Sequence, residues 1–128
     1  LLGPAGLYDD LNNLSVVSRF DCGEISFLFT GDMETPAETD LLAGGTLSAD
    51  VLDVGHHGSA TSSSQDFLER VAARVAVISC GIDNSYGHPH REIMEMLKAR
   101  NIQILRTDLN GTIVVSSDGK SLAVDTAK

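Results

Sequence analysis

Short apolar segments alternate with helix-like segments along the chain, and this alternation constrains the fold more than any other feature of the sequence. Residues 50–54 and 75–79 are apolar runs of strand length, and each is followed by a loop rich in glycine and polar residues. Helix-like segments come next, at residues 63–71 and from Pro89 to about Arg100. This order predicts strand, loop and helix units of the kind that build α/β domains.

Both ends of the chain carry hairpin signals. Near the N-terminus, β-branched and aromatic residues at 14–20 and 24–30 flank Gly23, whose freedom at positive φ suits a turn. Near the C-terminus, Asn110-Gly111 and Asp118-Gly119 are dipeptides that favour hairpin turns. They join three expected strands into an antiparallel meander, at residues 102–106, 111–116 and 121–125. Crossover units between two hairpins predict a layered α/β domain with a mixed sheet rather than a helical bundle.

Capping patterns predict where the helices begin. In the stretch Thr35-Pro36-Ala37-Glu38, Thr35 is the expected N-cap, proline suits the first helical position and Glu38 completes a capping box. This helix is expected to run to about Ala43, just before two glycines.

Two later helices follow similar signals. Ser63 and Asp66 have capping-box spacing at the start of the next helix. The helix that follows Pro89 is expected to face the core through a stripe formed by Ile93, Met94, Met96 and Leu97.

Composition and charge narrow the class of protein. The chain has 128 residues, of which 42% are hydrophobic and 21% charged, as expected for one soluble globular domain. The apolar runs are too short to cross a bilayer. Nine Lys and Arg against eighteen Asp and Glu give a net charge of -9, the wrong sign for binding nucleic acid by charge alone. Contact with a phosphate would need a bound cation or a local cluster of donors.

The start of the chain and its two cysteines give further expectations. The sequence begins Leu1-Leu2-Gly3-Pro4, with neither an initiator Met nor a signal peptide, and is expected to be a piece of a longer protein. Cys22 and Cys80 are far apart and form no C-x-x-C pair, so we expect them to be buried as small apolar residues.

Polar residues with catalytic potential follow the expected strands. Asp32 comes after residues 24–30, His56 and His57 come after 50–54, and His88 immediately precedes Pro89, at the expected N-cap of the last helix. If these strands are parallel neighbours, all four side chains meet at the edge where ligands bind in open α/β sheets. The alternatives are a turn residue for Asp32, ordinary loop residues for His56 and His57, and a helix cap for His88. His90 is expected to be an exposed polar residue.

This combination of residue types suits a divalent metal site. A carboxylate can bridge two cations, neutral imidazole supplies nitrogen ligands, and a hydroxide held between two metals is a nucleophile at neutral pH. The loop at residues 58–61 precedes a helix and could offer donors to a phosphate. The residues alone do not select the metal.

Several stretches, in their order and spacing, resemble the metallo-β-lactamase superfamily, and in particular the hydrolase domains of ComEC-type DNA internalisation competence proteins and their stand-alone relatives. The resemblance spans nearly the whole chain and is carried by Asn12-Asn13-Leu14-Ser15-Val16-Val17, Thr30-Gly31-Asp32, Ala49-Asp50-Val51-Leu52-Asp53-Val54-Gly55-His56-His57-Gly58-Ser59, Val77-Ile78-Ser79, Asn84-Ser85-Tyr86-Gly87-His88-Pro89, Arg106-Thr107-Asp108 and Gly111-Thr112-Ile113.

The resemblance implies a four-layer αββα sandwich, of which residues 1–128 would be the C-terminal half. It implies two divalent metal ions, Zn or Mn, with Asp32 as the bridging carboxylate. His57 would be the ligand to the second metal, and His56 would serve the substrate or the metal, the order of the two being open. His88 would lie on the substrate side.

One departure from the superfamily is serious. Its main metal motif, H-x-[HD]-x-D-H, is absent from this sequence, whose four histidines are all named above. The site in this chain is therefore expected to be incomplete, and the isolated fragment is expected to bind metal weakly and to be inactive. Without the N-terminal half, an apolar face should be exposed unless the chain forms a homodimer.

The resemblance implies a phosphodiester hydrolase, plausible as a nuclease acting on single-stranded DNA during competence-type uptake. In that mechanism a metal-bound hydroxide attacks phosphorus, and His56 or His88 stabilises the phosphate or protonates the leaving oxygen. Two alternatives stay open: a small-phosphoester esterase of the phosphorylcholine type, favoured by an aromatic content of only 5%, and a non-catalytic module. A competence-type parent would tether the domain to a membrane, whereas a stand-alone relative would be secreted or soluble.

Overall fold

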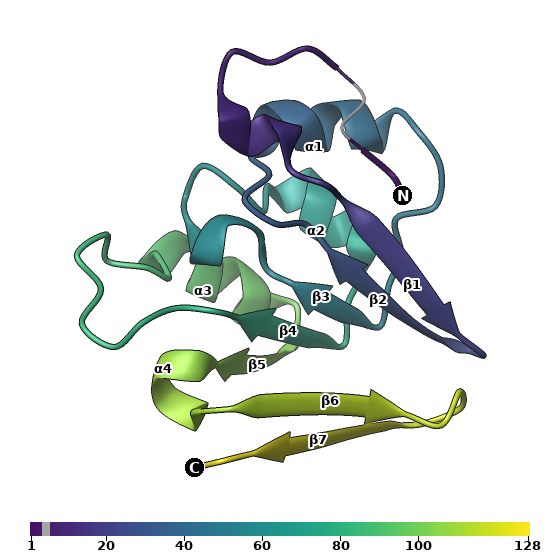
Figure 1. Ribbon diagram of the computed structural model, residues 1–128, viewed down its shortest axis with the longest axis vertical. Coiled ribbons are helices and arrows are strands. Elements are labelled where there is room, and N and C mark those ends of the chain that lie inside the picture. The colour runs from purple at the N-terminus through teal and green to yellow at the C-terminus, as the bar shows by residue number, and fades with distance from the viewer. Residues whose placement is uncertain (4–5) are drawn as a thin grey trace.

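A five-stranded mixed sheet forms the centre of the molecule (Figure 1). The computed structural model describes residues 1–3 and 6–128. The strands follow one another across the sheet in chain order: β1 (Ser18–Cys22), β2 (Ile25–Phe29), β3 (Val51–Asp53), β4 (Val75–Ile78) and β5 (Gln103–Arg106). β1 pairs antiparallel with β2, and β2 to β5 are parallel. The predicted mixed sheet and parallel crossover units are confirmed.

Helices connect the parallel strands and pack on one face of this sheet (Figure 1). They are α1 (Thr35–Leu42), α2 (Gln65–Val71) and α3 (Arg91–Ala99). Leu28, Leu52 and Ala76, one from each of three neighbouring strands, are fully buried in the core beneath the helices. Ile93 and Leu97 of α3 are buried there, and Met94 and Met96 pack against the same core, so the predicted stripe is confirmed.

A hairpin covers part of the opposite face. Its strands, β6 (Ile113–Ser117) and β7 (Leu122–Thr126), pair antiparallel as a separate two-stranded sheet. Val51, Val75 and Leu105 alternate with the helix-facing residues of their strands and pack against this hairpin. The layers therefore run helix, sheet, sheet, and the α/β class predicted from the sequence is confirmed.

The predicted C-terminal meander is wrong in one of its strands. β5 does not pair with β6 but joins β4 in parallel as the last strand of the main sheet. Asn110-Gly111 does not form a hairpin turn, because Asn110 ends the one-turn helix α4 (Thr107–Asn110) and Gly111 follows at a φ of 68°. The Asn110 Oδ1 atom accepts a hydrogen bond from the Arg106 N–H at 2.9 Å, which closes this turn. Asp118-Gly119 does connect β6 to β7, as predicted.

The first strand is shorter than predicted. Its expected start lies in a 3-10 turn, η1 (Leu11–Leu14), whose N-cap Asp10 accepts a hydrogen bond from the Asn12 N–H at 2.8 Å. β1 begins only at Ser18. The two-residue turn after Cys22 places Gly23 at a φ of 60°, in agreement with the predicted role of this glycine.

Both predicted capping boxes are wrong. The N-cap of α1 is Glu34, and the Thr35 hydroxyl donates instead to the Thr61 carbonyl at 2.9 Å. The Oδ1 atom of buried Asn13 accepts hydrogen bonds from the N–H groups of Glu34 and Ala37, at 3.2 Å each, and so caps this helix from outside.

α2 is capped in a similar way. Ser63 has a φ of 56° and lies outside the helix, and Ser64 is the N-cap, accepting from the Phe67 N–H at 3.4 Å. The buried carboxylate of Glu38 accepts hydrogen bonds from the N–H groups of Ser63 and Ser64. Burial raises the pKa of Glu38, and these hydrogen bonds act in the opposite direction. A carboxylate of α1 thus supports the start of α2.

Two smaller expectations are also corrected. α3 begins at Arg91 with His90 as its N-cap, so His88 is not the cap residue. Cys22 and Cys80 are free and only partly buried, and the Cys80 thiol donates to the Asp108 Oδ1 atom at 3.2 Å. Within residues 1–3 and 6–128, no helix combines the length and the apolar character needed to cross a membrane.

Candidate functional site

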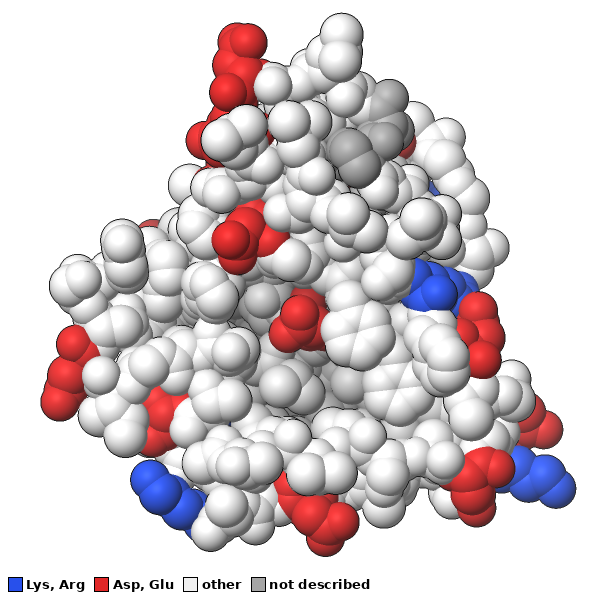
Figure 2. Space-filling model, in the orientation of Figure 1, with Lys and Arg blue, Asp and Glu red and all other residues white. Residues whose placement is uncertain are grey.

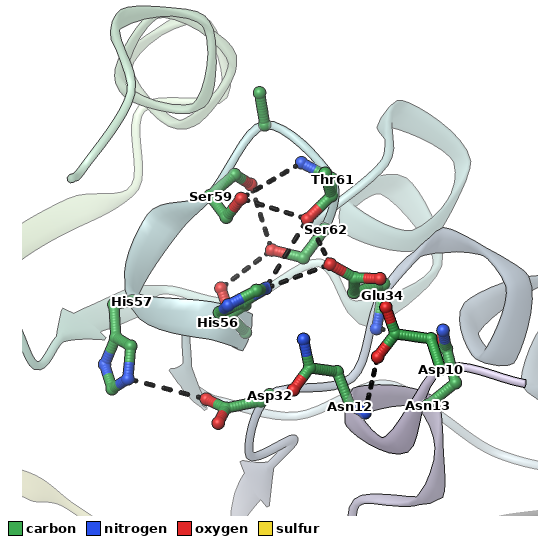
Figure 3. Close-up of polar contacts among 12 residues, drawn as sticks. Asp10, Asn12, Asn13, Asp32, Glu34, His56, His57, Ser59, Thr61 and Ser62 are labelled. Atoms are coloured by element: carbon green, nitrogen blue, oxygen red, sulfur yellow. Dashed lines mark hydrogen bonds and ion pairs between the residues drawn. The ribbon is translucent and has the colours of Figure 1, made fainter. Parts of the chain in front are cut away.

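The carboxyl ends of β2, β3 and β4 lie side by side, and the loops that follow them carry the four residues predicted to form a site. The Nε2 atom of His57 lies 3.5 Å from the Oδ1 atom of Asp32 (Figure 3). The ring centroid of His56 is 6.3 Å from that of His57 and 5.7 Å from that of His88. The structure therefore brings Asp32, His56, His57 and His88 together at one edge of the sheet.

The loop that carries the two adjacent histidines has an unusual backbone. It is the 3-10 turn η2 (Gly55–Gly58), in which His56 and His57 have φ values of 47° and 57°. A positive φ is uncommon for residues other than glycine and costs about 1–3 kcal/mol each. Gly58 has a φ of 80°, and a Cβ atom there would lie 2.6 Å from the Cβ atom of Pro89. The loop thus needs glycine where it meets the chain before α3.

His57 is held in one tautomer. Its Nδ1 atom lies 2.7 Å from the Ser79 carbonyl oxygen at the end of β4. Because a carbonyl oxygen can only accept, Nδ1 must carry the proton that it donates. The Nε2 atom is left to face the Asp32 carboxylate (Figure 3). Asp32 itself is positioned by its backbone N–H, which donates to the Ser15 hydroxyl at 3.1 Å.

His56 is oriented by a carboxylate. Its Nδ1 atom lies 3.1 Å from the Glu34 Oε1 atom, which also accepts a hydrogen bond from the Thr61 hydroxyl at 2.6 Å (Figure 3). The side chains of His56 and Glu34 are 24% and 14% exposed, so this contact is largely shielded from water. Because Nδ1 donates to Glu34, His56 also presents its Nε2 atom. Glu34 and Thr61 are site residues that the sequence reasoning missed.

His88 lies in a loop that a single asparagine holds together. The Asn84 side chain donates to the His88 carbonyl at 2.7 Å and accepts from the His88 N–H at 2.9 Å. Burial lowers the pKa of His88, and the neighbouring His90, His56 and His57 lower it further. This environment therefore favours the neutral form of His88 over the cation.

His90 is not the merely exposed polar residue that the sequence suggested. Its Nδ1 atom accepts a hydrogen bond from the Ala60 N–H at 2.8 Å, and its ring lies edge-on to His88 with a centroid separation of 4.8 Å. The Thr61 N–H donates to the Ser59 hydroxyl at 3.3 Å, and the Ser59 N–H donates to the His56 carbonyl at 2.9 Å. These three N–H groups are already bonded and are not free to bind a phosphate, so the predicted phosphate contact of residues 58–61 stays a prediction for the other donors of the loop.

A groove of about 440 Å³ extends from this edge along the loop after β4. Its lining includes His57, Ser79, Asn84, Tyr86 and His88. Figure 2 shows one face of the molecule, on which acidic side chains outnumber basic ones, in line with the acidic balance of the chain.

A second cavity, of about 220 Å³, lies between the two sheets. Apolar residues dominate its lining, among them Phe27, Val51 and Val77, and Asp53 at the end of β3 is its only acidic lining residue among those that the structure describes. Burial raises the pKa of Asp53 to about 6, with His57 lowering it and Asp32 raising it. Asp53 thus couples electrostatically to the site from the inter-sheet face.

The residues present supply only part of a metal site. Within residues 1–3 and 6–128, no three His, Cys, Asp or Glu side chains are grouped so that they could hold a metal ion. The Asp32–His57 pair nevertheless fits a shared cation, since the carboxylate oxygen and an unprotonated Nε2 atom are both acceptors and face one another at 3.5 Å. The same geometry also fits a protonated His57, whose Nε2–H would face the Asp32 carboxylate as a donor.

The fold and this edge define an α/β domain whose strand-end loops present a carboxylate and several histidines.

No known protein-family profile matches the chain. The chain is 41% identical over 103 residues to ComE operon protein 3 of Bacillus subtilis and 43% identical over 106 residues to Competence protein ComA of Neisseria gonorrhoeae. It is 37% identical over 118 residues to Recombination protein 2 of Haemophilus influenzae.

These matches cover 80%, 81% and 91% of the chain but only 13%, 15% and 15% of the relatives. The chain is therefore a homologue of one segment of much longer proteins, of which one is named for the ComE operon, one for competence and one for recombination. The predicted resemblance to competence proteins is confirmed at this level, and membership of the metallo-β-lactamase superfamily stays a prediction.

Proposed function

We propose that this chain is part of a metal-dependent phosphodiester hydrolase with the metallo-β-lactamase fold, acting on single-stranded DNA in competence-type DNA uptake. The biological setting is supported by the similarity to ComE operon protein 3 and Competence protein ComA. In such a parent protein, other segments would supply the rest of the metal ligands and a membrane tether.

The contact between Asp32 and His57 is the observation that carries the chemical part of the proposal. Ser79 fixes the tautomer of His57, so that its Nε2 atom faces a carboxylate oxygen at 3.5 Å. A histidine oriented by a carbonyl through its other nitrogen is the usual arrangement of a metal ligand. Asp32 and His57 would hold the cations, Zn or Mn, with His56 beside them. Bound divalent cations would act as Lewis acids on a phosphoryl oxygen.

The remaining histidines would act on the substrate. Because Nδ1 of His56 is bonded to Glu34, its Nε2 atom is the nitrogen left for the substrate, and when protonated it can donate a hydrogen bond to a phosphate or a leaving oxygen. Burial lowers the pKa of His88 and so favours its neutral form, and its expected part is to orient the substrate rather than to supply a proton. The chain has a net charge of -9 and repels phosphate, so bound cations would be needed for it to bind a phosphodiester.

The test uses the full-length protein, in which the rest of the site is present. We would measure bound metal and Mn²⁺- or Zn²⁺-dependent degradation of single-stranded DNA in the wild type, in Asp32→Ala, and in Asp21→Ala as a control acidic residue on β1. Asp32→Ala is expected to lower degradation by at least about 100-fold, the upper range for perturbing ligands or their supports. Asp21→Ala should leave it unchanged.

Other results would redirect the proposal. Unchanged metal content and hydrolysis in Asp32→Ala would reject the site. Stoichiometric metal with no DNA degradation would point to a small phosphoester, assayed with a chromogenic phosphodiester. If the wild type binds no metal and has no hydrolytic activity, the domain is a non-catalytic module.

A further inference from the structure

We propose that Tyr86 and the groove beside it form a subsite for a nucleobase, which holds the nucleotide next to the phosphate at the Asp32–His57 edge. This inference rests on the proposed hydrolase function and deepens it, because it assigns a recognition element for single-stranded nucleic acid.

The first observation is the exposure of Tyr86. Its side chain is 77% exposed, although the chain has only two Tyr, four Phe and no Trp. Tyr86 has no resolved hydrogen-bond partner among the described residues, and it packs against a single ring, that of His88. An aromatic side chain left open on one face is a stacking surface that the fold itself does not use.

The second observation is a path of rings from Tyr86 to the candidate site. Tyr86 and His88 are stacked, with centroids 5.7 Å apart and planes inclined by 22°. The His88 ring is in turn stacked at 6.5 Å from His57, with an inclination of 27°. The Tyr86 ring is thus separated from His57, the histidine that faces Asp32, by the ring of His88 alone. A base stacked on Tyr86 would therefore lie near a phosphate bound at the Asp32–His57 edge.

The third observation is the shape and rigidity of the groove. Its volume of about 440 Å³ can accommodate a planar ring system. The Asn84 amide bonds to the Gly81 carbonyl at 3.0 Å as well as to both backbone groups of His88, so the loop is held in place before any ligand binds. Less ordering entropy is therefore lost on binding.

Charge also favours an uncharged planar group here. Among the described residues that line the groove there is no Lys, Arg, Asp or Glu, in a chain whose net charge is -9. An anionic group would gain nothing from this lining, and a base is the uncharged part of a nucleotide. Stacking on an aromatic ring is tolerant of base identity and contributes about 1–3 kcal/mol per base.

The experiment measures binding rather than cleavage. With EDTA present, the full-length protein would be titrated into a fluorescently labelled oligothymidylate and into an abasic oligonucleotide of the same length. The variants are Tyr86→Ala, Tyr86→Phe, which keeps the ring, and Ile82→Ala, which removes an exposed apolar side chain from the same loop outside the groove.

Tyr86→Ala is expected to weaken oligothymidylate binding by about 5- to 150-fold, the equivalent of one stacked base, and to leave abasic binding within about twofold. Tyr86→Phe and Ile82→Ala should stay within about twofold on both ligands. An equal loss on both ligands, or no loss in Tyr86→Ala, overturns the subsite while the hydrolase proposal stands. No binding of oligothymidylate by the wild type overturns the subsite alone, because stacking on Tyr86 needs no cation whereas contact of this chain with a phosphate does. The Asp32→Ala metal assay tests the hydrolase proposal independently.

Discussion

At the scale of single residues, the most telling feature is the pair of left-handed histidines. His56 and His57 keep positive φ values because each ring is fixed by an acceptor from another element, Glu34 before α1 and Ser79 after β4. Residues held in sparsely populated conformations cluster at functional sites, where the surrounding structure determines them. The strained backbone and the two fixed tautomers support the same conclusion, that both imidazole rings are held in position as parts of a functional site.

Glu34 provides a test of this orientation. In Glu34→Ala, the Nδ1 atom of His56 loses its acceptor, so we expect ¹⁵N NMR of histidine-labelled protein to show His56 as a mixture of tautomers. Glu34→Gln can still accept through its amide oxygen and should retain the single tautomer. In the full-length protein, Glu34→Ala should lower hydrolysis by about 10- to 100-fold.

The control for this prediction is Glu95→Ala on the exposed face of α3, where Glu95 pairs with Arg91. It should leave the His56 signals unchanged. A Glu34→Ala spectrum identical to that of the wild type would show that Glu34 does not set the tautomer.

Only part of the site could be predicted from the sequence. Asp32, His56, His57 and His88 are visible because each follows a strand-like run. Glu34 and Thr61 could not be found in this way, since their contacts join positions 22 and 27 residues apart. The one local signal for Glu34 was its place two residues after Asp32, on the same loop.

At the scale of elements, helix starts depend on side chains from elsewhere. The Asn13 side chain, in η1, accepts from two N–H groups at the start of α1, and Glu38, in α1, accepts from two at the start of α2. The capping boxes read from the sequence failed for this reason. Local spacing identified residues able to cap, but buried partners from other elements took the free N–H groups.

Asn13→Ala should therefore destabilise the fold. The substitution removes an acceptor shared by two N–H groups in a buried position, and we expect the free energy of unfolding to fall by about 1–2 kcal/mol in urea denaturation. Asn12→Ala, the neighbouring and more exposed position, should change it by less than about 0.5 kcal/mol. Equal effects of the two substitutions would mean that the hydrogen bonds from Asn13 to the start of α1 do not stabilise the fold.

The misplaced meander has a similar cause. Asn110-Gly111 is a strong local signal for a hairpin, but Ile104 packs against the core under the helices and Leu105 against the β6–β7 side. A strand with apolar contacts on both faces gains more as the last strand of a sheet that is covered on both faces than in an exposed ribbon. Tertiary burial therefore decided the pairing of β5, whereas Asp118-Gly119, with no such competition, forms the turn that its sequence favours.

At the scale of the whole molecule, the inter-sheet face is incompletely covered. Phe20 and Phe29, on β1 and β2, are 59% and 46% exposed. Phe20 packs on Phe27, whose side chain lies toward the β6–β7 hairpin, with ring centroids 6.4 Å apart. This is an exposed apolar patch of the kind expected from the sequence if a partner or a further segment is missing.

Asp53 makes stability depend on pH across this same interface. Its pKa is about 6 in the folded protein against 3.8 as the ordinary value, so the folded state binds the proton more tightly. This contribution to stability is complete below pH 3.8 and is lost as the pH rises through about 6. Asp53→Asn removes the buried charge and should stabilise the protein by about 2 kcal/mol at pH 7.5, allowing for solvent screening.

The measurement is urea denaturation at pH 4 and at pH 7.5 with EDTA present. The increase in the free energy of unfolding caused by Asp53→Asn should be seen at pH 7.5 and not at pH 4. A gain of equal size at both pH values would show that it comes from packing rather than from ionisation. Asp125→Asn on β7, where the residue is exposed, serves as the matched control.

The order of the strands also sets when the site can exist during synthesis. Asp32, the two left-handed histidines and His88 lie on loops after β2, β3 and β4, which pair in chain order. A ribosome that has released the chain only as far as α2 has produced Asp32 and both histidines, but not the Ser79 carbonyl that fixes His57 or the loop that carries His88. The nascent chain therefore passes through a stage in which it carries these side chains without the geometry of the site, which is complete only after β4 has paired with β3.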